Sequence, residues 1–219
     1  MLEIENLISE KITNLWKEFS ENEFAKIPPL SVAQIPNNSL IFIGLNPSLS
    51  EVEKIRLLES NIKIEFYEHN FDKENNHKYF HKFIEIANKT NQSWGHFDLL
   101  YIRETKQDNV AKLMADKQGL NFIYKQILIS KLVLEKIIEE TNPKLFIVNN
   151  TLSRKFLGKD KINNNNIWMD LDFVWDNEIG TYRYKNIPFY FSSMLTGQRA
   201  LDLGSYERLI WQIKLVTEK

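Results

Sequence analysis

The segment Leu40-Ile41-Phe42-Ile43-Gly44-Leu45-Asn46-Pro47-Ser48 decides the fold class of this chain. Four consecutive apolar residues followed by turn formers predict a buried β-strand. The glycine and the proline then hold the backbone in a fixed loop at the carboxyl end of that strand. Ligands of open α/β sheets bind at this end of the strands. The segment therefore predicts both a sheet and the place of a site on it.

A second segment near the carboxyl terminus repeats the pattern. The apolar run Phe189-Tyr190-Phe191 passes into the polar stretch Ser192-Ser193-Met194-Leu195-Thr196-Gly197. If both runs are strands of one parallel sheet, their loops face each other across a crevice. Together the two loops predict a site.

The rest of the chain alternates between strand and helix patterns. Further buried strands are expected at 97–102 and 144–148, and helices at 2–19, 50–58, 77–87, 120–140, 151–156 and 206–216. This alternation is typical of a parallel α/β sheet. Two short runs, 168–173 and 182–184, lie on either side of a turn at 176–180 and predict an inserted antiparallel hairpin.

Composition excludes several classes of protein. The chain has 219 residues, 43% of them apolar, which favours one domain spanning 1–219 with a helical extension at 1–30 packed on it. Because cysteine is absent, there is no disulfide framework, thiolate metal site or cysteine nucleophile. No stretch approaches the roughly 18 apolar residues of a membrane span, and no signal peptide is evident, so we expect a cytoplasmic protein without a membrane partner.

Charge does not decide the partner, because the net charge of −1 neither supports nor excludes nucleic acid. Oligomeric state has no readable signal in the sequence, and a monomer is the simplest expectation. The spacing of His77 and His81 places both on one helical face, but no carboxylate cluster lies nearby in the sequence. We therefore predict no metal and no cofactor.

The two loops resemble motifs of a known superfamily. The stretch Gly44-Leu45-Asn46-Pro47-Ser48 resembles the first motif of the uracil-DNA glycosylase superfamily, in the Gly-x-Asn-Pro branch that includes the mismatch-specific uracil/thymine glycosylases. The loop at 192–199 stands where that superfamily has its second motif, commonly Ser-x-His-Pro-Ser. Residues 94–100 and 103–105 resemble its second-strand region. The order of elements fits over roughly residues 38 to 217.

This resemblance implies a three-layer α/β/α sandwich around a short parallel sheet of about four strands. It also implies hydrolysis of the N-glycosidic bond of uracil, or of another damaged or mismatched base, flipped out of DNA during base excision repair. Asn46 would be the catalytic residue and would orient the attacking water, since its amide is no general base. Gly44, Leu45 and Pro47 would shape the substrate loop, and the Ser48 hydroxyl would reach a phosphate.

The second loop departs from the superfamily pattern at Met194, which stands where many members have a histidine. A thioether cannot donate a hydrogen bond to the departing base. Other side chains of the loop would then make the contacts to substrate or DNA, with Leu195 or Arg199 as the wedge that replaces the flipped base. The remaining candidates in this loop are Ser192, Ser193, Thr196 and Gln198.

Three further groups have open interpretations. Arg103 either contacts a base or phosphate or forms a salt bridge with Glu104 or Asp98, and Asn149 either lines the pocket or caps a turn. Several aromatic residues either stack on a base or belong to the core, namely Phe66, Tyr67, Phe71, Tyr79 and Phe80. Beside the glycosylase, two alternatives remain: a catalytically reduced protein that binds nucleotide or nucleic acid, and a fold relative with another small-molecule or protein partner.

Overall fold

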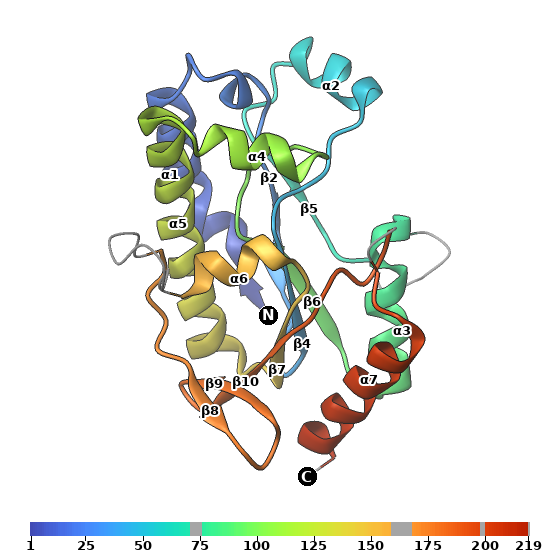
Figure 1. Cartoon of the computed structure of the whole chain (residues 1–219). Helices are drawn as coiled ribbons and strands as arrows, with labels where there is room; N and C mark the ends of the chain where they lie inside the picture. Colours follow the sequence, from blue (N-terminus) through green and yellow to red (C-terminus); the bar gives the residue numbers. More distant parts are fainter. Residues whose placement is uncertain (71–75, 159–167, 198–199, 219) are drawn as a thin grey trace.

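A computed structural model describes residues 1–70, 76–158, 168–197 and 200–218. Within these ranges the chain is mixed α/β, with a central sheet of six strands in the order β6-β4-β7-β10-β9-β8 (Figure 1). Their bounds are β6 Trp94–Asp98, β4 Leu40–Gly44, β7 Leu145–Val148, β10 Ile187–Phe191, β9 Thr181–Tyr184 and β8 Val174–Asp176. The first four are mutually parallel, and β9 and β8 are antiparallel additions. The sheet thus has six strands where we expected about four, because the hairpin joins its edge.

The first strand of the predicted hairpin was misplaced. Residues 168–173 do not pair with β9, because Met169 N–H and Leu171 N–H donate instead to the carbonyls of Phe156 and Leu157. The strand begins only at Val174. The other half of the prediction, 182–184, lies within β9.

Helices cover both faces of the sheet (Figure 1). On one face lie α1 (Ile4–Glu18), α5 (Lys117–Thr141) and α6 (Thr151–Leu157), and on the other lie α3 (His81–Lys89) and α7 (Leu203–Thr217). Each face has its own buried apolar cluster. The predicted helices at 2–19, 120–140, 151–156 and 206–216 all correspond to helices of the structure. Their apolar spacing reflects these two cores.

Smaller elements surround the sheet, and sequence reasoning missed most of them. The short helix α4 (Gln107–Leu113) is not among the helices predicted from the sequence. The predicted helix at 50–58 corresponds to α2 (Glu51–Leu58). The others are β1 (Leu2–Glu3), η1 (Glu23–Lys26), β2 (Leu30–Val32), β3 (Gln34–Ile35), β5 (Glu65–Tyr67) and η2 (Lys78–Phe80). Among the described residues, no helix is both long enough and apolar enough to cross a membrane.

Two connections place the switch point of the sheet between β4 and β7. The chain leaves β4, passes through α3 on one face and returns as β6; it then passes through α5 on the other face and returns as β7. Because the two crossovers lie on opposite faces, the strand order reverses between β4 and β7. Crevices open outside the carboxyl ends of strands at such a point.

The strand β6 lies three residues earlier than the predicted 97–102. Residues 99 and 100 are extended and donate their N–H groups to the carbonyls of Gly44 and Leu45, which continues the contact with β4 beyond the strand itself. On the other side of β6, the N–H of His96 donates to Nε2 of His69 over 2.8 Å. The last residue of β6 is Asp98.

Candidate functional site

The four parallel strands end side by side in a row of residues on the α3/α7 face. Gly44 pairs in register with Asp98 of β6. Asn149 directly follows β7, and its N–H donates to the carbonyl of Ile43; Ser192 directly follows β10, and its N–H donates to Val148. We call Asp98, Gly44, Asn149 and Ser192 the terminal row. It lies at the switch point, so topology and residue type indicate the same place for a ligand.

Gly44 leaves space that its neighbour fills. A Cβ atom at Gly44 would lie 2.0 Å from Oδ1 of Asp98 and 2.8 Å from Nε2 of His96. Such distances do not occur between real atoms, so the carboxylate of Asp98 leans across the backbone of β4. A glycine is therefore required here because the Asp98 side chain lies so close to its Cα atom, and not because of the backbone dihedral angles of Gly44.

The carboxylate of Asp98 is nearly buried and poorly paired. Its side chain is 11% exposed, and the nearest ionisable group is Nε2 of His96, at 3.5 Å from Oδ1. Within the described ranges it accepts no hydrogen bond, although an ionised carboxylate has room for about four. Nδ1 of His96 lies 2.9 Å from the hydroxyl of Tyr67. Burial, and then the charge of Asp98, raises the pKa of Tyr67 well above its usual value, so the phenol stays neutral.

The other half of the terminal row also has free acceptors. The Asn149 residue is 4% exposed; its Nδ2 donates to the Tyr79 hydroxyl over 3.3 Å, while its Oδ1 is buried and has no partner among the described residues. The hydroxyl of Ser192 is likewise buried with no partner in the described part of the chain, and the carbonyl of Ser192 accepts from Arg154. Buried polar groups are normally hydrogen-bonded. These unpaired atoms indicate a site that a ligand completes.

Asn46 stands two residues beyond the terminal row and is held firmly. Its Nδ2 donates to the carbonyls of Pro47 (2.9 Å) and Glu104 (2.6 Å). The hydroxyl of Thr105 fixes the same loop by donating to the carbonyl of Leu49 over 2.6 Å. Since both amide hydrogens are engaged, Oδ1 is the atom of Asn46 left to accept a hydrogen bond from water.

The remaining loop residues are dispersed. Leu45 and Pro47 are buried and Ser48 is exposed; Ser193 is exposed, and Met194 and Thr196 are half-buried. Leu195 is only 5% exposed and packs in the α3/α7 core, so in this arrangement it is not available as a wedge. Gln198, Arg199 and Phe71 lie outside the described residues.

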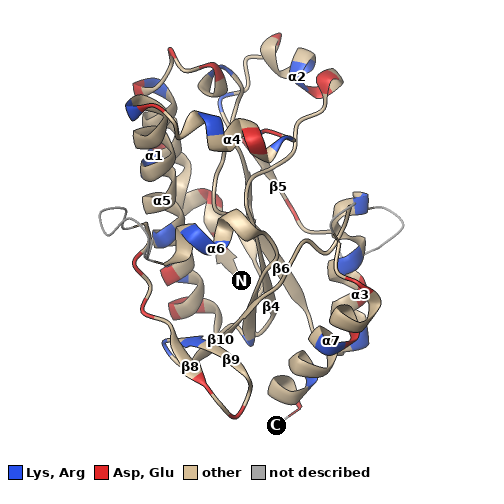
Figure 2. Ribbon diagram, in the orientation of Figure 1, with Lys and Arg blue, Asp and Glu red and all other residues tan. Residues whose placement is uncertain are grey.

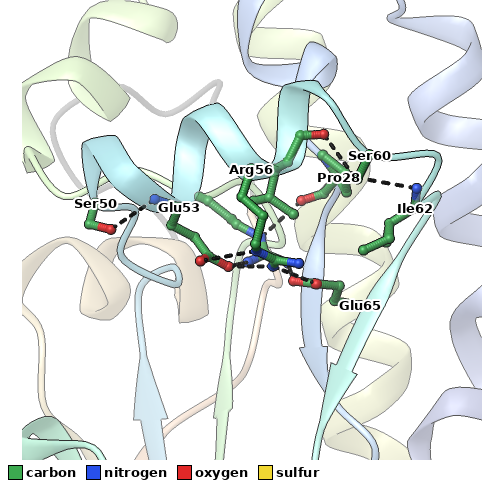
Figure 3. A network of polar contacts seen from close by, with 9 residues as sticks. Pro28, Ser50, Glu53, Arg56, Ser60, Ile62 and Glu65 are labelled. Carbon is green, nitrogen blue, oxygen red and sulfur yellow. Dashed lines mark hydrogen bonds and ion pairs between the residues drawn. The ribbon is translucent and has the colours of Figure 1, made fainter.

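Arg103 forms a cluster of four charges with Glu53, Arg56 and Glu65, and Figure 3 labels these three partners. Its Nε donates to the carbonyl of Pro28 over 2.9 Å, its Nη2 pairs with Glu65, and its Nη1 lies 3.6 Å from Glu53. Arg56 joins the same two carboxylates. The salt bridge considered from sequence exists, but its partners are Glu53 and Glu65 and not Glu104 or Asp98. Arg103 thus fastens α2 and β5 to the chain after β6.

Sequence reasoning missed Asp98 and His96 as site residues. The available signal was their alternation on one strand, which puts both on the same face. Tyr67 and Tyr79, weighed only as stacking aromatics, contribute their hydroxyls to this face. Among the described residues, no group of three or more His, Cys, Asp or Glu is arranged to hold a metal ion.

Positive charge lies on both sides of the row. Figure 2 shows Lys and Arg on α6 and around the start of α3. Lys155 and Lys78 in these regions are exposed, and neither forms an ion pair with another described residue. Two surface hollows, of about 650 and 510 Å³, lie elsewhere, lined by residues such as Lys144 and Pro188 or Asp172 and Phe191. They do not include the terminal row.

Comparisons with known proteins provide no further assignment: no family model matches the chain, and no curated protein or solved structure is significantly similar to it.

Proposed function

We propose that this chain is a DNA glycosylase that hydrolyses the N-glycosidic bond of a base flipped from DNA onto the terminal row. The observation that carries the proposal is the row itself: buried polar atoms without partners among the described residues gather at the switch point, and Asn46 follows Gly44 of the row by two residues. A flipped base offers hydrogen-bonding edges that match such atoms. The helices on both faces also agree with the three-layer α/β/α sandwich that the resemblance implies.

The proposed chemistry is hydrolysis without a general base at Asn46. As the bond from the sugar carbon to the base nitrogen breaks, its electron pair leaves with the base. Oδ1 of Asn46 accepts a hydrogen bond from a water and so orients it toward the sugar carbon. The water oxygen bonds to that carbon, and its proton neutralises the departing base. A fixed amide suits this positioning role.

Charge near the row supports DNA as the partner. Lys155 on α6 and Lys78 at the start of α3 are exposed and unpaired among the described residues, so they are available to phosphates. The overall charge of −1 limits this to local contacts. We therefore expect the affinity for DNA to fall with increasing salt concentration, with a slope that corresponds to only a few phosphate contacts.

A second candidate is a protein that binds a nucleotide or DNA base without turnover. Met194 favours it, because the described part of the second loop has no imidazole to stabilise the charge of a departing base. In this case the row binds the base but the bond stays intact.

Single-turnover cleavage of labelled oligonucleotides separates these candidates. The panel contains uracil, thymine mismatches, hypoxanthine, oxidised bases and the unmodified bases, in single and double strands. We expect abasic product with the wild type and a loss of roughly 100-fold or more with Asn46→Ala. Asn88→Ala is the matched control, because Asn88 is an exposed amide at the far end of α3. Binding without product by wild-type protein would support the second candidate.

A further inference from the structure

The terminal row contains two hydrogen-bond acceptors that no described residue uses, beside the Ser192 hydroxyl, which can donate as well as accept. Within the described ranges, the carboxylate of Asp98 accepts no hydrogen bond, and the buried Oδ1 of Asn149 has no partner. The Nδ2 group of Asn149 donates one of its two N–H groups to the Tyr79 hydroxyl. Because a carboxylate accepts hydrogen bonds and does not donate them, Asp98 favours donors on its side of the row.

Among the described residues, the ionisable group within ion-pair distance of Asp98 is the imidazole of His96, whose Nε2 lies 3.5 Å from Oδ1 and forms no hydrogen bond. Burial and the charge of Asp98 raise the pKa of the Tyr79 hydroxyl, so it is neutral, like that of Tyr67. Burial and the nearby His96 lower the pKa of His69 to about 3, so His69 is neutral too. No lysine or arginine of the described residues lies within ion-pair distance of Asp98.

We propose that the terminal row selects bases that carry an exocyclic amino group over bases that carry a carbonyl at the same place. This inference rests on the proposed function, whose substrate class it specifies. The amino N–H groups donate to Asp98 and to Oδ1 of Asn149. A carbonyl in that position directs its lone pairs at the carboxylate and leaves both acceptors unpaired.

The size of the preference follows from desolvation. Sites built to hydrogen-bond a substrate N–H reject the analogue that lacks it strongly, because the buried acceptor is left unpaired. Asp98 is 11% exposed, so water reaches it only in part. We therefore expect a preference of about 100-fold or more for the amino base.

Matched pairs of substrates test this directly. Each pair differs only by amino against carbonyl: cytosine and uracil, adenine and hypoxanthine, guanine and xanthine. The wild type should process the amino member of at least one pair about 100-fold faster. In Asp98→Asn the new amide N–H₂ donates to a carbonyl, so the preference should reverse. Asp172→Asn, at an exposed carboxylate outside the row, should leave the preference unchanged.

The outcomes separate the two proposals. Product from the carbonyl members at equal or higher rate, with no reversal in Asp98→Asn, overturns the selectivity but leaves the glycosylase. No product from any substrate overturns the glycosylase, and thermal-shift titration with cytidine and uridine then decides the selectivity. Preferential stabilisation by cytidine that reverses in Asp98→Asn supports it, and an equal or opposite response overturns it. Circular dichroism of each variant confirms folding.

Discussion

Gly44→Ala inserts a methyl group where the carboxylate of Asp98 now lies. The added carbon would stand 2.0 Å from Oδ1 of Asp98 and 2.8 Å from Nε2 of His96, so at least the Asp98 side chain must rotate away. Overpacking of this kind costs about 1–3 kcal/mol. Replacing a strand glycine with alanine returns about 0.5–1 kcal/mol through the unfolded chain. The net expectation is a loss of about 1–2 kcal/mol in the free energy of unfolding.

Thermal and urea unfolding measure this loss. For a chain of this length it corresponds to an unfolding midpoint roughly 2–8 °C lower. Gly204→Ala is the control, since a Cβ there meets only Asp202 at 3.3 Å and the position is in the first turn of α7. The control should be as stable as the wild type or slightly more so. A Gly44→Ala protein with unchanged stability and unchanged base preference would refute the packing of Asp98 over Gly44.

The four-charge cluster gives two further predictions. Arg103→Met should lower the free energy of unfolding, measured by urea titration, by about 2–3 kcal/mol. The loss is smaller than for a fully buried pair because Glu65 and Glu53 are partly exposed and Arg56 still pairs with both. The control Arg208→Met, at an exposed arginine, should have little effect in the same titration. Burial raises the pKa of Glu65, but hydrogen bonds from Arg56 and Arg103 lower it by more, and a hydrogen bond from Arg56 lowers that of Glu53. These two carboxylates therefore contribute fully to stability above about pH 4.5, and the contribution is lost as the pH falls through their lowered pKa values. The difference in free energy of unfolding between wild type and Arg103→Met should then narrow below about pH 4. A constant difference down to about pH 2.5 would contradict this assignment.

The elements that were predictable have strong internal patterns. The helix α5 has apolar residues at helical spacing over many turns, and β4 and β7 are uninterrupted apolar runs before turn residues. Short elements were missed because their order comes from distant partners. The pair β2 and β5 depends on residues more than 30 positions apart, which no local pattern reveals.

In the candidate site, too, residues with a local sequence signal were predicted and residues that depend on distant partners were missed. Gly44, Asn149 and Ser192 were identified because each directly follows an apolar run. Asp98 was missed because the strand was expected at 97–102, which put this residue inside the strand instead of at its end. Residues 99–102 are buried by the core without being strand, so hydrophobicity alone misplaced the boundary. For Arg103, the sequence offered only charged neighbours along the chain, whereas its partners Glu53 and Glu65 lie in α2 and β5.

The imidazole of His69 affects whether the sheet can add a strand from another chain. Its Nε2 accepts a hydrogen bond from the backbone N–H of His96 at the edge of the sheet, where a strand of another chain could otherwise pair. With a pKa of about 3, His69 remains an acceptor throughout the neutral range, so this seal does not open on mild acidification. At the opposite border stands β8, which spans only Val174–Asp176. Addition of further strands is thus disfavoured at both borders, by the His69 side chain at one and by the shortness of β8 at the other.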